Sequence, residues 1–132
     1  YKNVDCVIVN NAELRHELRN KIDKIEKLMK LIANKINIKN LIVTKGSDGA
    51  ILYNKKNNKF DYCPAFATKI IDKVGAGDAM MSVISLALRK KVDLSLSLLI
   101  GSLAGAQSVE TIGNSISISK KMILKNLQHL MK

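Results

Sequence analysis

The sequence is poor in the residue types that mark several functional classes. Its 132 residues include no tryptophan, and aromatic side chains make up 4% of the chain. No aromatic motif of the kind that stacks RNA bases is visible. The two cysteines, Cys6 and Cys63, form no CxxC pair, and His16 and His129 have no companions at ligand spacing. We therefore expect no zinc site, a buried and reduced Cys6 in an apolar strand, and both histidines on helix surfaces.

Long hydrophobic runs are also missing. No apolar stretch approaches the roughly 18 to 20 residues that a transmembrane helix needs. No signal peptide precedes the first apolar segment. The chain begins with Tyr1 rather than Met, so we expect it to be a piece of a longer protein. Its length and its 47% hydrophobic content are sufficient for one domain with a real core.

Negative charge is scarce, since 22 Lys and Arg residues face 11 Asp and Glu, which gives a net charge of +11. A basic balance raises nucleic acid as a partner. The charge comes mainly from lysines spread along the chain, and the only arginines are Arg15, Arg19 and Arg89. This distribution favours attraction of a small polyanion such as a nucleotide over a specific nucleic-acid partner. We expect no membrane partner.

Hydrophobic periodicity and turn residues predict an α/β fold without repeats or long linkers. The first strand–helix–strand unit indicates a parallel sheet, whose faces the later helices would cover. A polar turn at 55–58 predicts a hairpin, and Ser119 is a plausible N-cap. The expected strands are 4–9, 40–46, 50–54 and 59–63, with an extended segment at 68–71, and the expected helices are 12–33, 78–89, 94–111 and 119–131.

The strongest candidate for chemistry is the stretch DKVGAGDA, residues 72–79. Because glycine lacks a Cβ, Gly75 and Gly77 let backbone N–H groups approach an anion at the start of a helix. Asp78 would then accept the proton of an attacking hydroxyl while the amides hold a phosphoryl group. The alternative is a glycine-rich turn with Asp78 as an ordinary N-cap. The small and apolar residues that follow predict a fully buried helix.

A second candidate is VNNAEL, in which Asn10 and Glu13 follow a predicted strand. Open α/β sheets bind ligands at the carboxyl ends of their strands. An amide and a carboxylate there would orient water around Mg²⁺, which usually keeps several waters. The alternative interpretation is a helix cap followed by an acid in the first turn.

A third candidate is VTKGSDG, where a strand ends at Thr44 and Gly46 and Gly49 follow. The hydroxyl and the exposed amides are suited to nucleotide phosphates. The alternative interpretation is a simple loop that opens the next strand.

The order and spacing of these motifs resemble the C-terminal half of the PfkB (ribokinase-like) family of carbohydrate kinases, over essentially the whole chain. The family's NxxE motif is matched by Asn10 and Glu13, and its nucleotide-binding T-x-G segment by Thr44 and Gly46. Its signature D-x-x-G-A-G-D, which supplies the anion hole and the catalytic aspartate, is matched by Asp72, Gly75, Ala76, Gly77 and Asp78.

Three further positions depart from the family pattern. Lys73 stands where the family commonly has a small or hydroxylated residue, and Val83 where it prefers Ala or Gly. Ser102 takes a helix position that often carries Asn near the adenine, so we expect it to contact the nucleotide. The resemblance also implies a monovalent-cation site for K⁺ at Asp72 and the loop 113–117.

The resemblance implies a partial Rossmann-type, mostly parallel sheet flanked by helices. Residues 1–132 would be the ATP-binding and catalytic portion of a cytoplasmic kinase that uses ATP and Mg²⁺ to phosphorylate a sugar-like hydroxyl. The N-terminal, sugar-binding half is absent from this sequence, so the piece alone should be inactive, and the full-length protein would be compatible with a homodimer. The alternatives are a vitamin or nucleoside kinase of the same superfamily and a non-catalytic nucleotide-binding module.

Overall fold

The computed structural model describes residues 4–72, 74–112 and 117–131. They form two compact units that divide after Pro64, and each unit is described by itself. The elements of the first unit are β1 (Cys6–Asn10), α1 (Asn11–Glu17), α2 (Ile25–Lys35), β2 (Asn40–Thr44), the 3₁₀ turn η1 (Gly46–Asp48), β3 (Ala50–Asn54) and β4 (Lys59–Cys63). Those of the second are α3 (Ala76–Arg89), α4 (Leu94–Val109) and α5 (Lys120–Leu130).

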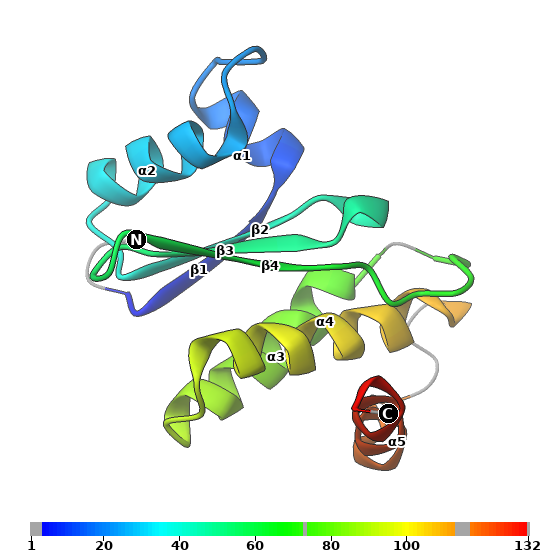
Figure 1. The fold of residues 1–132 in the computed structure, drawn as a ribbon. Helices are drawn as coiled ribbons and strands as arrows, with labels where there is room; N and C mark the ends of the chain where they lie inside the picture. The colour runs from blue at the N-terminus through cyan, green and yellow to red at the C-terminus, as the bar shows by residue number, and fades with distance from the viewer. Residues whose placement is uncertain (1–3, 73, 113–116, 132) are drawn as a thin grey trace. The chain divides into compact units, whose positions relative to one another are not determined.

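The sheet of the first unit has the strand order β1-β2-β3-β4 (Figure 1). β1 and β2 are parallel because the helical crossover α1–α2 connects them, as the strand–helix–strand pattern predicts. β2, β3 and β4 are antiparallel neighbours, since short turns join them. The α/β class is confirmed, but within this chain the sheet is mixed rather than mostly parallel.

Side-chain alternation divides the sheet residues between two faces. Helices α1 and α2 cover one face (Figure 1), and the core beneath them contains Leu28 and Met29 from α2 together with Leu41, Val43 and Ile51 from the strands. Each of these five side chains is at most 2% exposed. This apolar layer fixes the register of the sheet, because a slip by one residue would turn every strand over.

The single helix expected over 12–33 is instead two helices. α1 ends at the C-cap Leu18, and Arg19 follows with a left-handed φ of 48°. The Asn20 side chain then accepts hydrogen bonds from the backbone N–H groups of Ile22 and Asp23, at 3.1 and 3.0 Å. A short polar side chain that hydrogen-bonds the local backbone competes with the hydrogen bonds of the helix, so the helix breaks here. The apolar periodicity of the side chains nevertheless continues across the break.

In the second unit α3 packs along α4, and α5 packs on α4 (Figure 1). Leu103, Ala104 and Ile123 form its buried cluster. Ser119 is the N-cap of α5, as predicted, and its side chain accepts from Met122 N–H. The expectation that α3 is fully buried was wrong: it buries Met80 and Ile84, whereas Leu86 is 68% exposed.

Further comparisons with the sequence concern single segments. His16 and His129 are exposed on α1 and α5, as predicted. The extended segment at 68–71 is not a strand. Cys6 and Cys63 are free thiols, Cys6 half-buried and Cys63 buried. Lys73 and most of the loop 113–117 lie outside the described residues.

Across the ranges that the structure describes, no helix is both long and apolar enough to span a membrane.

Candidate functional site

Asn10 and Thr44 are direct neighbours at the carboxyl ends of the two parallel strands. They end β1 and β2 and are paired in register. Strand alternation places both on the sheet face opposite the α1–α2 core, since Val9 and Val43 pack into that core. The fold therefore brings together two of the predicted site residues at the edge where open α/β sheets bind their ligands.

Asn10 and Glu13 form a capping box at the start of α1. Glu13 N–H donates to Asn10 Oδ1 and Asn10 N–H donates to Glu13 Oε2, both at 2.8 Å. The structural alternative for this motif is thus realised. Both residues are exposed, and each accepting oxygen has a second lone pair. An amide oxygen and a carboxylate fit the hard-oxygen environment of a hydrated Mg²⁺.

The loop after Thr44 turns sharply at glycine. Gly46 has φ 62° and Gly49 has φ 81°, values that favour residues without a Cβ. Lys45 N–H donates to Gly49 carbonyl at 2.8 Å and closes the loop around η1. A Cβ added at Gly46 would meet no atom within 4 Å, so the space beside this backbone is open.

The helix α3 starts at a glycine with no side-chain cap. Gly75 is the N-cap in the left-handed conformation, φ 84°, and the first helical bond runs from Ala79 N–H to Gly75 carbonyl at 2.9 Å. The preceding amides of the first turn, those of Ala76, Gly77 and Asp78, have no acceptor within the helix. α1, α4 and α5 instead have Asn, Asp or Ser side chains as caps. A bare helix start of this kind suits an anion.

Asp78 lies in the first turn of α3 rather than at the N-cap, so the N-cap alternative for this residue was wrong. Its side chain is exposed, and its backbone carbonyl accepts from Ser82 Oγ at 2.8 Å. Asp72 Oδ1 accepts from Val74 N–H at 2.9 Å and so shapes the loop before the helix.

The C-terminal end of α4 holds this loop in place. Val109 carbonyl accepts from the N–H groups of Ile71 and Asp72, at 2.7 and 3.1 Å. Glu110 Oε1 accepts from both the backbone N–H and the hydroxyl of Thr68, each at 3.0 Å. Sequence reasoning missed these anchors, because a backbone carbonyl has no signature in the sequence and a lone glutamate has little.

Ser102 stands on α4, and its Oγ is buried without a hydrogen-bond partner among the described residues. Three residues further along the same helix, Gly105 lies close to the start of α3: a Cβ there would meet Ala76 carbonyl at 3.4 Å. The second unit thus has Gly75, Ala76, Gly77 and Asp78 at the start of α3, which packs against α4. The first unit brings together Asn10, Glu13, Thr44 and Gly46.

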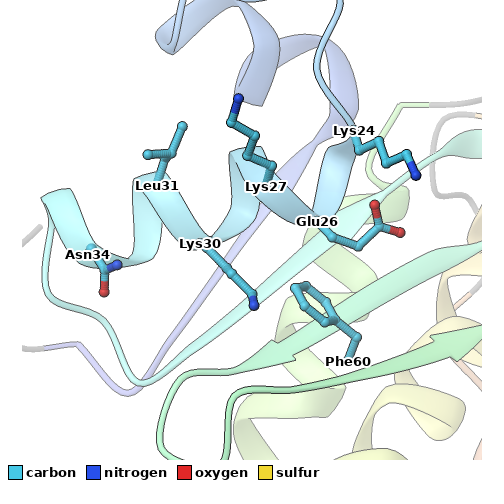
Figure 2. A pocket seen from close by; sticks show the side chains of 7 residues that line it. All are labelled: Lys24, Glu26, Lys27, Lys30, Leu31, Asn34 and Phe60. Atoms are coloured by element: carbon cyan, nitrogen blue, oxygen red, sulfur yellow. The ribbon is translucent and has the colours of Figure 1, made fainter.

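A groove of about 350 Å³ lies between α2 and β4 and contains none of the predicted site residues (Figure 2). It is lined by Lys24, Glu26, Lys27, Lys30, Leu31, Asn34 and Phe60. The Phe60 ring stacks on Tyr53, with 4.7 Å between centroids, and Lys30 Nζ lies 5.6 Å from the Phe60 centroid. Lys27 pairs with Asp23 at 2.8 Å. Phe60, Lys30 and Lys27 of the groove are thus engaged in local contacts.

The backbone arrangement is that of the ribokinase-like α/β kinases. The chain superposes on Escherichia coli phosphofructokinase-2 in complex with potassium with a TM-score of 0.84 and 22% identity, over 99% of this chain and 42% of that one. Arabidopsis thaliana ribokinase complexed with ribose and ATP gives a TM-score of 0.80 at 22% identity, over 96% and 42% of the two chains. A model of the pfkB family of carbohydrate kinases matches residues 1–121, and the chain belongs to this family.

Curated relatives agree with this assignment. The bifunctional protein HldE of Campylobacter curvus is 32% identical over 119 residues, which cover 87% of this chain and 25% of that protein. A ribokinase of Dictyostelium discoideum is 35% identical over 95 residues, covering 61% of this chain and 30% of its own length. The chain therefore spans between a quarter and a third of these curated relatives.

Proposed function

We propose that this chain is the ATP-binding, catalytic portion of a longer kinase that transfers the γ-phosphoryl group of ATP to a hydroxyl of a sugar or sugar-like substrate. The observation that carries the proposal is the uncapped start of α3, where Gly75 with φ 84° is followed by Asp78 in the first turn. Membership of a carbohydrate kinase family supports it. The acceptor-binding half would be supplied by the part of the protein outside this sequence.

In the proposed reaction Asp78 takes the proton from the acceptor hydroxyl as its oxygen attacks the γ-phosphorus. The bond from phosphorus to the bridging oxygen of ADP breaks at the same time, and the leaving oxygen keeps the electron pair. The amides of Ala76, Gly77 and Asp78 face the charge that develops on the transferred group. Open space beside Gly77, where a Cβ would meet nothing within 4 Å, fits a phosphoryl group at this position.

The remaining predicted residues would bind the nucleotide and its ions. Asn10 and Glu13 would orient waters around Mg²⁺, which neutralises phosphate charge when bound. Thr44 and Gly46 would contact the nucleotide phosphates, and Ser102 would lie near the base. Asp72 would contribute to a K⁺ site.

The decisive experiment uses a longer polypeptide that includes the preceding half. Its Asp78→Asn variant is compared with the unsubstituted form. Turnover should fall by about 10² to 10⁴-fold, the usual contribution of a positioned general base. ATP affinity should stay the same or increase, because a negative charge beside the γ-phosphate is removed. Asp93→Asn is the matched control, since Asp93 is an exposed N-cap on α4 and Asn caps equally well. Near-normal turnover of Asp78→Asn would refute the assignment.

Two other functions remain as outcomes of the same assay. One is a vitamin or nucleoside kinase, and similarity to a Methanocaldococcus jannaschii nucleoside kinase, with a TM-score of 0.75 and 26% identity, favours testing it. A panel of sugars, nucleosides and vitamins as acceptors separates these substrate classes. The other is a non-catalytic nucleotide-binding module, which would bind ATP but phosphorylate no acceptor in the panel.

A further inference from the structure

We propose that Glu110 is a positioning residue for the anion-binding start of α3. Glu110 is the C-cap of α4, and it holds the segment that leads to Gly75, so that the backbone amides after Gly75 keep their direction. The inference rests on the proposed function and deepens it, because it names a residue outside the three motifs on which that function would depend. The action of Glu110 is indirect, through the backbone of the loop.

The first observation is that one carboxylate oxygen binds both hydrogen-bond donors of one residue. Glu110 Oε1 accepts from the backbone N–H and from the hydroxyl of Thr68, each at 3.0 Å. The two residues are 42 positions apart, so the contact is tertiary and joins the end of α4 to the loop before α3. Hydrogen bonds to a charged acceptor are stronger than those between neutral groups. Two of them fix the orientation of Thr68 as well as its distance.

The second observation is that the last residue of α4 holds the next part of the same loop. The final four carbonyl groups of a helix have no partner inside the helix. Val109 carbonyl is one of them, and it accepts from the N–H groups of Ile71 and Asp72, at 2.7 and 3.1 Å. Thr68 and Ile71 are only three residues apart. The Glu110 carboxylate and the Val109 carbonyl therefore restrain the same short segment from adjacent positions of α4.

The third observation is that the restraints continue from this segment to the helix start. Asp72 Oδ1 accepts from Val74 N–H at 2.9 Å, and Gly75 follows with a φ of 84°. Gly105 of α4 lies against the first turn of α3, since a Cβ there would meet Ala76 carbonyl at 3.4 Å. α4 thus restrains the chain both before and after Gly75.

The fourth observation is that the start of α3 has no side-chain cap of its own. Gly75 makes no capping hydrogen bond through a side chain, and glycine restricts the backbone least of all residues. Amides stabilise developing negative charge efficiently only when they are held in the right direction in advance. A misplacement of about 1 Å can cost about 10²-fold in rate. The direction of these amides therefore depends on restraints from outside α3, and Glu110 supplies one that a substitution can remove.

Kinetics of the longer polypeptide test the proposal with Glu110→Ala and a matched control, Asp93→Ala. At the N-terminal end of α4, Asp93 Oδ1 also accepts two hydrogen bonds, from Ser95 and Leu96 N–H at 2.9 and 3.1 Å. Both variants should lower the melting temperature. Only Glu110→Ala should lower kcat, by about 10 to 100-fold, with little change in KM for ATP because the nucleotide-binding residues are unchanged. Equal kcat in the two variants, measured where both are folded, would overturn the proposal.

Conservative variants show whether the hydrogen bonds to Thr68 carry the effect. Glu110→Gln keeps an oxygen that can accept from both donors, so it should recover most of the kcat that Glu110→Ala loses. Thr68→Val removes the hydroxyl and keeps the N–H, so its loss should be smaller. The losses of Thr68→Val and Glu110→Ala should not add in the double variant, because the two residues share one contact. A Gln variant as slow as the Ala variant, or additive losses, would contradict the proposal.

Amide hydrogen exchange, measured by NMR on the same longer polypeptide, gives a readout that needs no activity. Glu110→Ala should speed exchange of the Ile71 and Asp72 amides at least about tenfold, because the segment opens locally more often, and Asp93→Ala should not. Unchanged exchange in Glu110→Ala would overturn the proposal. If the unsubstituted polypeptide phosphorylates no acceptor, the proposed function fails by itself, and the exchange rates still decide whether Glu110 holds the loop.

Discussion

Asn10 and Glu13 each accept the backbone N–H of the other, at 2.8 Å in both directions. The pair that family resemblance assigns to Mg²⁺ is therefore also the N-terminal cap of α1. The two roles are compatible, because each accepting oxygen retains a lone pair on the exposed side. They predict different consequences for different substitutions.

Glu13→Gln separates the two roles. Gln retains the capping hydrogen bond, so the melting temperature should change little. If Glu13 orients the waters of Mg²⁺, the Mg²⁺ concentration for half-maximal activity of the longer polypeptide should rise about 10 to 100-fold, as for other residues that support a metal indirectly. Glu17→Gln is the control on the same helix, since Glu17 forms an exposed ion pair with Lys35 at 2.7 Å. An unchanged Mg²⁺ dependence of Glu13→Gln would assign the motif to capping alone.

Gly77→Ala should separate stability from activity. A methyl group there meets no atom within 4 Å, and replacing glycine inside a helix stabilises by about 0.5 to 1 kcal/mol. The same methyl group would enter the space proposed for the phosphoryl group, so turnover of the longer polypeptide should fall. Thermal melting and kcat measured on one preparation check both parts. A stable variant with normal kcat would show that no phosphoryl group approaches Gly77.

Gly75→Ala should have the opposite effect on stability. Gly75 has φ 84°, and a left-handed backbone costs an L-residue with a Cβ roughly 1 to 2 kcal/mol. Chemical denaturation of the second unit's helices should therefore show a loss of about that size. A neutral result would mean that the loop before α3 does not need the left-handed conformation.

Gly101→Ala tests the packing of α4 on α3. An added Cβ would lie 2.5 Å from Ile84 Cγ1 and 3.2 Å from Met80 Cγ. Overpacking of this kind costs typically about 1 to 3 kcal/mol. The double variant Gly101→Ala with Ile84→Ala should lose less stability than the sum of the two single losses, because substitutions at neighbouring residues are not additive. Strict additivity in the double variant would contradict the close contact.

The stability of the first unit should depend on pH through Cys6. Burial, followed by the nearby Asp5 charge, raises the pKa of the Cys6 thiol from 9.0 to about 11. The unfolded chain therefore loses this proton first, so the contribution is complete below about pH 9 and is lost as the pH rises to about 11. Two pKa units correspond to at most about 3 kcal/mol. Cys6→Ala should remove this part of the alkaline destabilisation, measured by urea denaturation at pH 8 and pH 11.

Much of the local structure was predictable from the sequence because the signals are local. The hairpin around residues 55–58 and the Ser119 cap follow from turn and capping residues that act within a few positions. The periodicity behind the helix predicted over 12–33 correctly indicated helical structure at both ends of this range. It did not reveal the break at Arg19 and Asn20, since periodicity in the side chains continues when the backbone turns.

The motifs of the candidate site were recognisable because glycine and carboxylate residues have specific chemical roles, in close backbone approach to an anion and in proton transfer. Gly75, Gly77 and Asp78 could be selected before any fold was known, and so could Asn10 and Glu13. Whether Asp78 is a cap or a first-turn acid was not decidable from spacing alone. That distinction depends on where the first helical hydrogen bond forms, from Ala79 to Gly75.

The sequence by itself determined the family motifs, the strands and most helices, because these depend on side-chain chemistry and short-range geometry. Only the tertiary structure decided that Val109 carbonyl anchors the loop before α3 and that Leu86 is exposed on a helix with an apolar sequence. Among the described residues, it also decided that β1 is an edge strand of the sheet and β2 an interior strand, although both are apolar. The reason is that burial and backbone pairing depend on which distant segments become neighbours, and no residue type encodes that arrangement alone.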